Sequence, residues 1–178
     1  MSLFVVALTC TSFALVACDQ PITVHTATNP AASFDQYQTF SFGSSEAPPN
    51  GYNGFPRSTE VERRAEPVIA AALEKRGYVP APASAGKGDL VILFGSGLRT
   101  VVDHEVSEVG QDWLPDDERG DFVEGSLVVD AFDGRKGLRV WHGASRAEIN
   151  PAHIDDALLE KTVSDLLQTF PSGKAGAR

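Results

Sequence analysis

Cysteine is nearly absent from this chain of 178 residues, which contains only Cys10 and Cys18. Both lie within the first 18 residues, so residues 19–178 have no thiol. That part of the chain therefore has no disulfide, no redox-active cysteine and no metal site built on thiolates. The length corresponds to one domain, and the residues after Cys18 can bury a substantial core without disulfides.

Positive charge is also scarce. The chain has 15 lysines and arginines against 24 aspartates and glutamates, which gives a formal net charge of −9. Its Lys and Arg residues form no dense block. Binding to nucleic acid depends on clustered cations that neutralise phosphates. The composition therefore excludes nucleic acid as a partner.

An uncharged apolar run opens the chain, where residues 3–17 read LFVVALTCTSFALVA. A membrane-spanning helix needs about 20 apolar residues, whereas this length fits the apolar part of an export signal. We therefore predict that residues 1–17 are a signal peptide. The alternative is a buried N-terminal helix or strand with a core cysteine, although no amphipathic pattern marks the run as one face of such an element.

The end of this run, Leu15-Val16-Ala17-Cys18, resembles the lipobox of bacterial lipoproteins. In such proteins the signal is cut before the cysteine, whose thiol is joined to diacylglycerol and whose new amine is acylated. The resemblance implies lipidation at Cys18 and a protein held to the inner or outer membrane, facing the periplasm. No Lys or Arg precedes the run, so either Met1 is not the true start or a basic segment has been lost.

The rest of the chain divides into three parts. We expect an anchor over residues 18–21, one folded domain over 22–171 and a disordered tail over 172–178.

The folded domain contains several predicted strands. Alternating apolar residues predict strands over 22–26 and 38–42, and a run that is apolar on both faces predicts a central strand over 90–94. Residues 125–148 read as a hairpin that turns at 133–137. Residues 43–57 read as a loop, in which Tyr52 and Phe55 are either a pinned lid or loop packing.

Two helices are predicted from apolar residues at helical spacing. The first begins at a capping box, Thr59 to Glu62, and ends at Gly77, with a kink or a later start at Pro67. The second begins at Asp155 or Asp156 and ends before Pro171. Between the central strand and the hairpin, residues 103–124 are rich in acid and are expected to form a solvated loop.

This order of elements, β-β-α-β-β-β-α, predicts an α+β fold. We expect a two-layer sandwich, with a mostly antiparallel sheet and two helices packed on one face. The apolar faces of these elements have nothing else to cover them. The predicted core is Leu73, Tyr78, Leu90, Ile92, Leu127, Val129, Val140, Trp141, Leu166 and Phe170.

Short motifs spread over the chain resemble those of the domain of unknown function 4136 family of bacterial lipoproteins. Besides Cys18 they are Phe34-x-x-Tyr37-x-Thr39-Phe40, Leu73-x-x-Arg76-Gly77-Tyr78, Asp89-Leu90-Val91, Gly125-x-Leu127-x-x-Asp130-x-x-Asp133, Val140-Trp141-x-Gly143-Ala144 and Phe170-Pro171. The chain departs from the family in its missing basic segment and its acidic stretch near 103–124. The resemblance implies an exported, lipid-anchored α+β domain and no established reaction.

Candidate metal ligands lie mostly in the acidic stretch. Asp103-His104-Glu105 offers an imidazole between two carboxylates, and Asp116, Asp117, Glu118 and Asp121 offer hard oxygens suited to calcium. Neither set has the spacing of a known metal site, and a solvated acidic surface is the other interpretation of the second. The remaining imidazoles are His25, His142 and His153. We predict no metal site and no cofactor.

Catalytic motifs are also weak. Gly95-Ser96-Gly97 is too short for a nucleophile elbow. Asp130 interrupts an apolar strand and is either a hydrogen-bonded structural carboxylate or a catalytic one, and Trp141-His142-Gly143 reads as a core aromatic beside a strand glycine. The sequence therefore favours a non-enzymatic binding or scaffold lipoprotein whose partner is an envelope protein or a cell-wall component. The alternative is an envelope hydrolase acting on cell wall or lipid.

Overall fold

A computed structural model describes residues 21–44, 50–55, 58–101, 122–151 and 154–173 of the chain. Cys18, the expected signal peptide and most of the acidic stretch lie outside these residues. Within them, no helix is long and apolar enough to cross a membrane.

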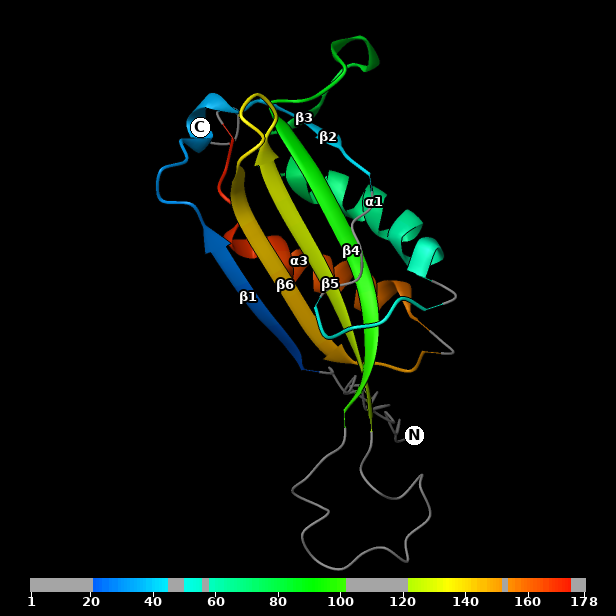
Figure 1. Cartoon of the computed structure of the whole chain (residues 1–178). Coiled ribbons are helices and arrows are strands. Elements are labelled where there is room, and N and C mark those ends of the chain that lie inside the picture. The colour runs from blue at the N-terminus through cyan, green and yellow to red at the C-terminus, as the bar shows by residue number, and fades with distance from the viewer. Residues whose placement is uncertain (1–20, 45–49, 56–57, 102–121, 152–153, 174–178) are drawn as a thin grey trace, which may run out of the picture.

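Six strands form one sheet in the order β1-β6-β5-β4-β2-β3. Neighbours from β1 to β4 pair antiparallel, whereas β2 pairs parallel with both β4 and β3. Figure 1 shows β1 at one side of the sheet, followed by β6, β5 and β4, with the short β2 and β3 beyond the start of β4. The strands are β1 (Ile22–Thr28), β2 (Thr39–Phe42), β3 (Val79–Pro80), β4 (Leu90–Val101), β5 (Phe122–Asp133) and β6 (Arg139–Glu148).

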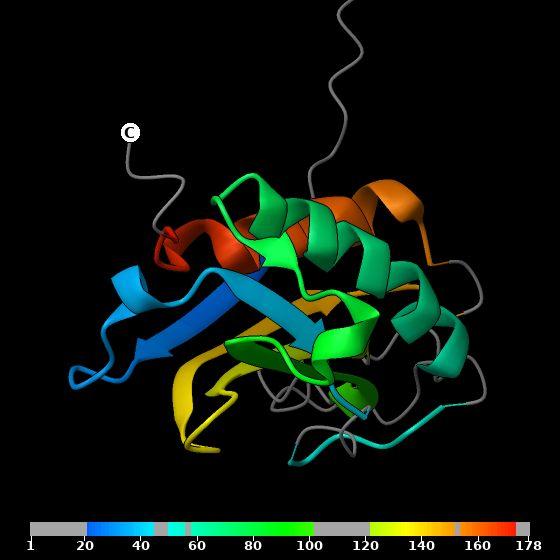
Figure 2. The same ribbon diagram turned by 90° about the horizontal axis from the view of Figure 1, so that it is seen from above.

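Two helices cover one face of this sheet, as Figure 2 shows from above. Helix α1 spans Ser58–Glu74 and packs over β4, while α3 spans Asp156–Leu166 and packs over β1 and β6. An ion pair between Arg64 and Asp156 joins the beginnings of the two helices. The described residues also form three short 3-10 segments: η1 (Phe34–Gln36), η2 (Ala83–Ala85) and η4 (Leu167–Thr169). The predicted two-layer α+β sandwich is confirmed.

The helix ends agree with the sequence, except at the start of α1. Gly77 has a φ of 89°, and the Tyr78 N–H donates to the Leu73 carbonyl at 3.2 Å, which is the predicted glycine cap. Asp155 caps α3 by accepting from the Ala157 N–H at 2.9 Å.

The predicted capping box is wrong. Helix α1 begins at Ser58, so Thr59 lies inside the helix rather than before it, and the helix also continues through Pro67. The Glu62 carboxylate accepts from the Ser96 N–H at 3.3 Å. This bond joins α1 to β4, 34 residues away in the sequence.

The central strands are longer than predicted. Strand β4 continues past Phe94 to Val101 and pairs with β5 along its whole length. Strand β5 begins at Phe122, so residues 122–124 belong to a strand and not to the predicted acidic loop. Beyond the other end of the expected domain, the Gly173 N–H donates to the Arg76 carbonyl at 2.9 Å.

All ten residues of the predicted core are buried. Val140 and Trp141 are both buried although they are consecutive in β6, where strict alternation would expose one of them. The register accounts for this, because Ala131 faces Trp141 while Phe132 faces Arg139, which leaves Val140 as the extra residue of a β-bulge.

Candidate functional site

The described structure leaves part of the predicted chemistry untested. Cys18, His104, His153 and the acidic residues Asp116, Asp117, Glu118 and Asp121 lie outside it. Among the residues that it does describe, no three His, Cys, Asp or Glu side chains gather as a metal site would require.

Asp130 lies on the sheet face opposite the helices and is 4% exposed. Its carboxylate is 2.8 Å from Nδ1 of His142, the residue directly across on β6. The Arg139 guanidinium also approaches, with Nη1 3.4 Å from the same carboxylate oxygen. A buried carboxylate is stable when it is hydrogen-bonded and paired in this way, so the geometry is that of the structural alternative for Asp130.

A second polar cluster, formed by Tyr37, Thr39, Asp89, Asp133 and Arg135, lies at the end of the sheet where β2 and β4 begin and β5 ends. The Tyr37 hydroxyl donates to Asp133 Oδ2 at 3.0 Å. Asp89 Oδ2 accepts from the N–H and the hydroxyl of Thr39 at 3.1 and 3.0 Å, and Asp89 Oδ1 from Arg135 at 3.1 Å. These bonds connect the start of β2 to the start of β4 and to the β5–β6 turn.

The pKa directions in this cluster follow from its contacts. Burial opposes ionisation of Asp133, but hydrogen bonds from the Lys136 N–H, the Tyr37 hydroxyl and the Arg135 N–H outweigh burial and lower its pKa. Asp89 likewise has a lowered pKa, because bonds from Gln38, Thr39 and Arg135 outweigh burial. Burial, together with the bond to Asp133, raises the pKa of Tyr37 to about 12.

Three separate motifs of the sequence hold four members of this cluster: Tyr37 and Thr39 in the first, Asp89 in the second and Asp133 in the third. Tyr37 and Asp133 are 96 positions apart, and Thr39 and Asp89 are 50 apart. Their meeting depends on the parallel pairing of β2 with β4, which no local pattern predicts. The one signal was that Tyr37, Thr39, Asp89 and Asp133 occur among the motifs of the family resemblance, whereas Arg135 occurs in none of them.

Tyr52 and Phe55 pack against the sheet. The Tyr52 hydroxyl donates to the Glu124 carboxylate, and the Arg99 guanidinium lies 5.0 Å from the Tyr52 ring centre while its Nε donates to Glu124 at 2.8 Å. Asn53 forms an isolated antiparallel bridge with Leu98 of β4. These contacts are loop packing, the second of the two alternatives for this segment.

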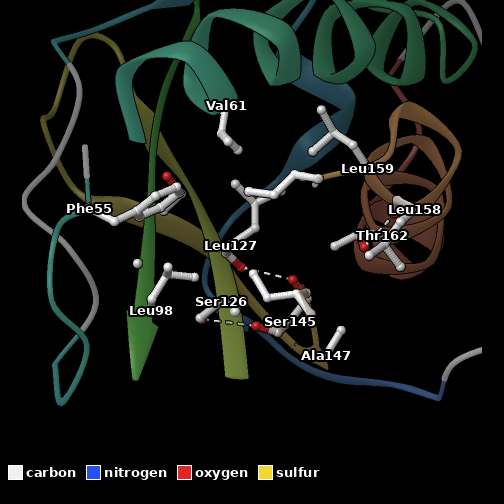
Figure 3. A pocket seen from close by; sticks show the side chains of 15 residues that line it. Phe55, Val61, Leu98, Ser126, Leu127, Ser145, Ala147, Leu158, Leu159 and Thr162 are labelled. Carbon is white, nitrogen blue, oxygen red and sulfur yellow. Dashed lines mark hydrogen bonds between the residues drawn. The ribbon is translucent and has the colours of Figure 1, made fainter. Parts of the chain in front are cut away.

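An apolar cavity of about 60 Å³ lies between the helices and the sheet (Figure 3). Its walls include Phe55, Val61, Leu98 and Leu159. The hydroxyls in the wall are already bonded within the protein, as the bond from Ser145 to the Leu127 carbonyl illustrates. A cavity of roughly 150 Å³ can hold benzene, so this one is smaller than a cavity known to take a single aromatic ring.

Ser96 is the hydroxyl closest to a catalytic motif, and it lies inside β4 rather than on a turn from strand to helix. Its Oγ is 3.4 Å from Glu62 Oε1. No serine or threonine hydroxyl of the described residues is hydrogen-bonded to His25 or His142. The arrangement of nucleophile, base and orienting carboxylate that a hydrolase of the serine type needs is therefore not assembled among these residues.

Comparison with curated proteins finds no match. Among solved structures, a PDZ domain protein from Parabacteroides distasonis has 13% identity and a TM-score of 0.54, over 85% of this chain and 36% of its own. A DUF4136 family protein from Bacteroides thetaiotaomicron has 15% identity and a TM-score of 0.49, over 84% of this chain and 96% of its own. The PelC dodecamer from Paraburkholderia phytofirmans has 14% identity and a TM-score of 0.48, over 83% and 95%.

At 13% identity the PDZ domain protein, whose TM-score is 0.54, supports the fold alone. The model of one protein family, the domain of unknown function DUF4136, matches residues 24–172. This match spans every element of the described structure apart from the first two residues of β1. The chain therefore belongs to the DUF4136 family.

Proposed function

We propose that this protein is an exported lipoprotein of the bacterial cell envelope, held to a membrane by lipid on Cys18, and that its domain binds a partner rather than catalysing a reaction. The observation that carries the proposal is the uncharged run of residues 3–17, which ends at Leu15-Val16-Ala17-Cys18. The rest of the chain contains no cysteine that competes for this role.

The start of the domain is compatible with such an anchor. Strand β1 begins at Ile22 on the edge of the sheet, and Pro21 before it is exposed. Residues 18–21 can extend by about 3.3–3.6 Å each. A lipid on Cys18 would thus be attached through a short tether that leaves the surface of the fold, and its insertion into a bilayer would not require the core to open. Two or more acyl chains are enough for stable attachment.

The polar side chains of the described residues support a binding role over catalysis. Asp130 is engaged by His142, and Asp133 by Tyr37 and the β5–β6 turn. Glu124 is engaged by Tyr52 and Arg99. Each group holds two segments of the fold together, which leaves it less free to act on a substrate. The partner we propose is an envelope protein or a cell-wall component. An envelope hydrolase is the weaker alternative because, among the residues that the structure describes, no serine or threonine hydroxyl is hydrogen-bonded to a histidine.

Replacement of Cys18 tests the anchor. We expect Cys18→Ala to leave the chain uncleaved or to release the domain into the soluble fraction of the envelope. The matched control is Cys10→Ala, which changes the other cysteine inside the uncharged run and should leave attachment intact. If Cys18→Ala still fractionates with membranes as a processed, mature chain, the anchor is wrong.

A further inference from the structure

The two edges of the sheet differ in what they offer to another strand. At one edge, β3 has only two residues. The N–H groups of Val79 and Ala81 donate inward, to the carbonyls of Gln38 and Phe40 at 3.0 and 2.7 Å. The residue between them, whose N–H would point outward, is Pro80, which has no N–H. A short strand with proline at its outward position is a known protection against pairing with another chain.

The other edge, β1, has no such protection. Its seven residues, ITVHTAT, contain no charge, no proline and no glycine. From His25 to Thr28 every residue is exposed. Figure 1 shows β1 as the outermost strand on its side of the sheet. Long, uncharged edges of this kind are templates for pairing with a further strand.

The backbone groups that β1 leaves free can be identified from its pairing with β6. The Asn29 N–H donates to the Val140 carbonyl at 2.9 Å, so residues of the same parity, such as Ala27 and His25, direct their backbone groups toward β6. Backbone groups alternate along an antiparallel strand. The residues whose N–H and C=O point outward are therefore Ile22, Val24, Thr26 and Thr28.

These four outward residues match their own copy. An antiparallel pair with twofold symmetry forms hydrogen bonds between residues whose numbers add to a constant. If the numbers of paired residues add to 50, Ile22 of one copy pairs with Thr28 of the other, and Val24 of one copy pairs with Thr26 of the other. The twofold axis generates the same two pairs again with the copies exchanged. This register uses every outward group, and it places the two His25 residues directly opposite each other at the centre. Since β1 has no charged residue, no fixed like charges oppose each other across the axis.

We propose that two copies of this chain join through β1, antiparallel and centred on His25, to form one continuous sheet. The side chains that such pairing covers fit this partner. Ile22 and Val24 lie on the helix side of the sheet, where Ala147 and Ser145 face them on β6, and both are only half-buried in one copy. In the pair, each receives a threonine of the other copy as its cross-strand neighbour, and apolar surface left at the end of the core is removed from water. The proposal does not depend on lipid at Cys18.

Cysteine crosslinking tests the register in the full-length chain, with Cys10 and Cys18 both changed to serine and the protein held in detergent. We expect His25→Cys to form a covalent dimer on mild oxidation. The two copies of residue 25 would be a non-hydrogen-bonded pair, and in antiparallel strands the Cα atoms of such a pair are about 4.5 Å apart, within the range of a disulfide. Thr23→Cys is the matched control on the same strand and face. It should not crosslink to itself, since Thr23 faces Ala27 of the other copy, but a mixture of Thr23→Cys and Ala27→Cys chains should.

Loss of one outward N–H tests the same pairing without a covalent bond. Thr26→Pro removes an outward donor and leaves the inward bonds to β6, whereas Thr26→Val alters the side chain and keeps the donor. In sedimentation equilibrium we expect concentration-dependent dimers for the parent and Thr26→Val, and a severalfold weaker dimer for Thr26→Pro. A monomer at every concentration, a dimer that Thr26→Pro leaves unchanged in a folded protein, or equal crosslinking of His25→Cys and Thr23→Cys would each overturn the proposal. If Thr26→Pro does not fold, the two cysteine variants still decide it.

Discussion

The indole ring of Trp141 lies over Gly143, two residues further along the same strand. A Cβ atom built on Gly143 would be 2.8 Å from Cζ3 of the ring, and 3.0 Å from Leu166 Cδ1. The Trp141 ring also contacts Phe170, with 4.9 Å between ring centres. A glycine at residue 143 thus provides the space in which the largest core side chain lies against the sheet.

The first prediction follows from this contact. Gly143→Ala should destabilise the domain by about 1–3 kcal/mol, because a methyl group in a filled core displaces its neighbours. Urea denaturation of the variant beside the parent measures the difference. Ala144→Ser, at the next residue and on the opposite face of the sheet, is the control and should change stability by no more than about 0.5 kcal/mol. Equal stability of Gly143→Ala and the parent would mean that the ring lies elsewhere.

Phe170 carries the second prediction. It is 3% exposed and contacts the rings of Phe34, Tyr78 and Trp141, with 5.8, 5.8 and 4.9 Å between ring centres. Phe170→Ala should cost about 3–5 kcal/mol, as for other buried aromatic residues. Chemical denaturation measures it, with Leu138→Ala as a control at a residue that is 59% exposed. A loss below about 1 kcal/mol for Phe170→Ala would show that the C-terminal segment is not part of the core.

Acid should unfold the domain in part through Asp133 and Asp89, whose pKa values in the folded protein are lowered. Such groups stabilise the fold fully above their pKa in the unfolded chain, about 3.9, and this contribution is lost as the pH falls through the lowered values. The free energy of unfolding, measured by denaturation at a series of pH values, should therefore decline below about pH 4. Asp133→Asn should be less stable at neutral pH, and its free energy of unfolding should decline less as the pH falls. If the decline below about pH 4 is the same as in the parent, the hydrogen bonds to the Asp133 carboxylate do not stabilise the fold.

Alkali should also destabilise this cluster, by ionising the Tyr37 hydroxyl. The pKa of Tyr37 is raised from 10.0 to about 12, first by burial and then by its bond to Asp133. A raised pKa contributes stability that is complete below the unfolded value and is lost as the pH rises through the folded value. We expect stability to fall between about pH 10 and 12 for the parent, and less for Tyr37→Phe. If the two profiles are parallel, Tyr37 does not donate to Asp133.

Local signals in the sequence were sufficient for the helix ends at Gly77 and Asp155, because a glycine with positive φ and a capping carboxylate act within a few residues. The apolar spacing was sufficient for the core. The capping box at Thr59 was wrong because helix α1 begins one residue earlier, at Ser58, which places Thr59 inside the helix. The same carboxylate that the pattern assigned to the cap, Glu62, also bonds to Ser96 on β4, a contact between distant segments that no local pattern predicts.

Contacts between distant segments account for what the sequence did not predict. The parallel pairing of β2 with β4 joins residues 50 positions apart, and the Tyr37–Asp133 bond depends on it. The bulge at Val140 shifts the register of β5 with β6, and no residue pattern marked it. Asp130 was singled out because a carboxylate interrupts an apolar strand, but its pairing with His142 follows from that register and from no motif.

The most direct test of the proposed function is the mass of the N-terminal peptide of the protein isolated from membranes of cells that express the full-length chain. The account predicts a peptide that begins at Cys18, carries diacylglycerol on the thiol and an acyl group on the amine, and is missing from the Cys18→Ala variant. A peptide that begins at Met1, or one that begins after residue 18 with no lipid, would contradict it.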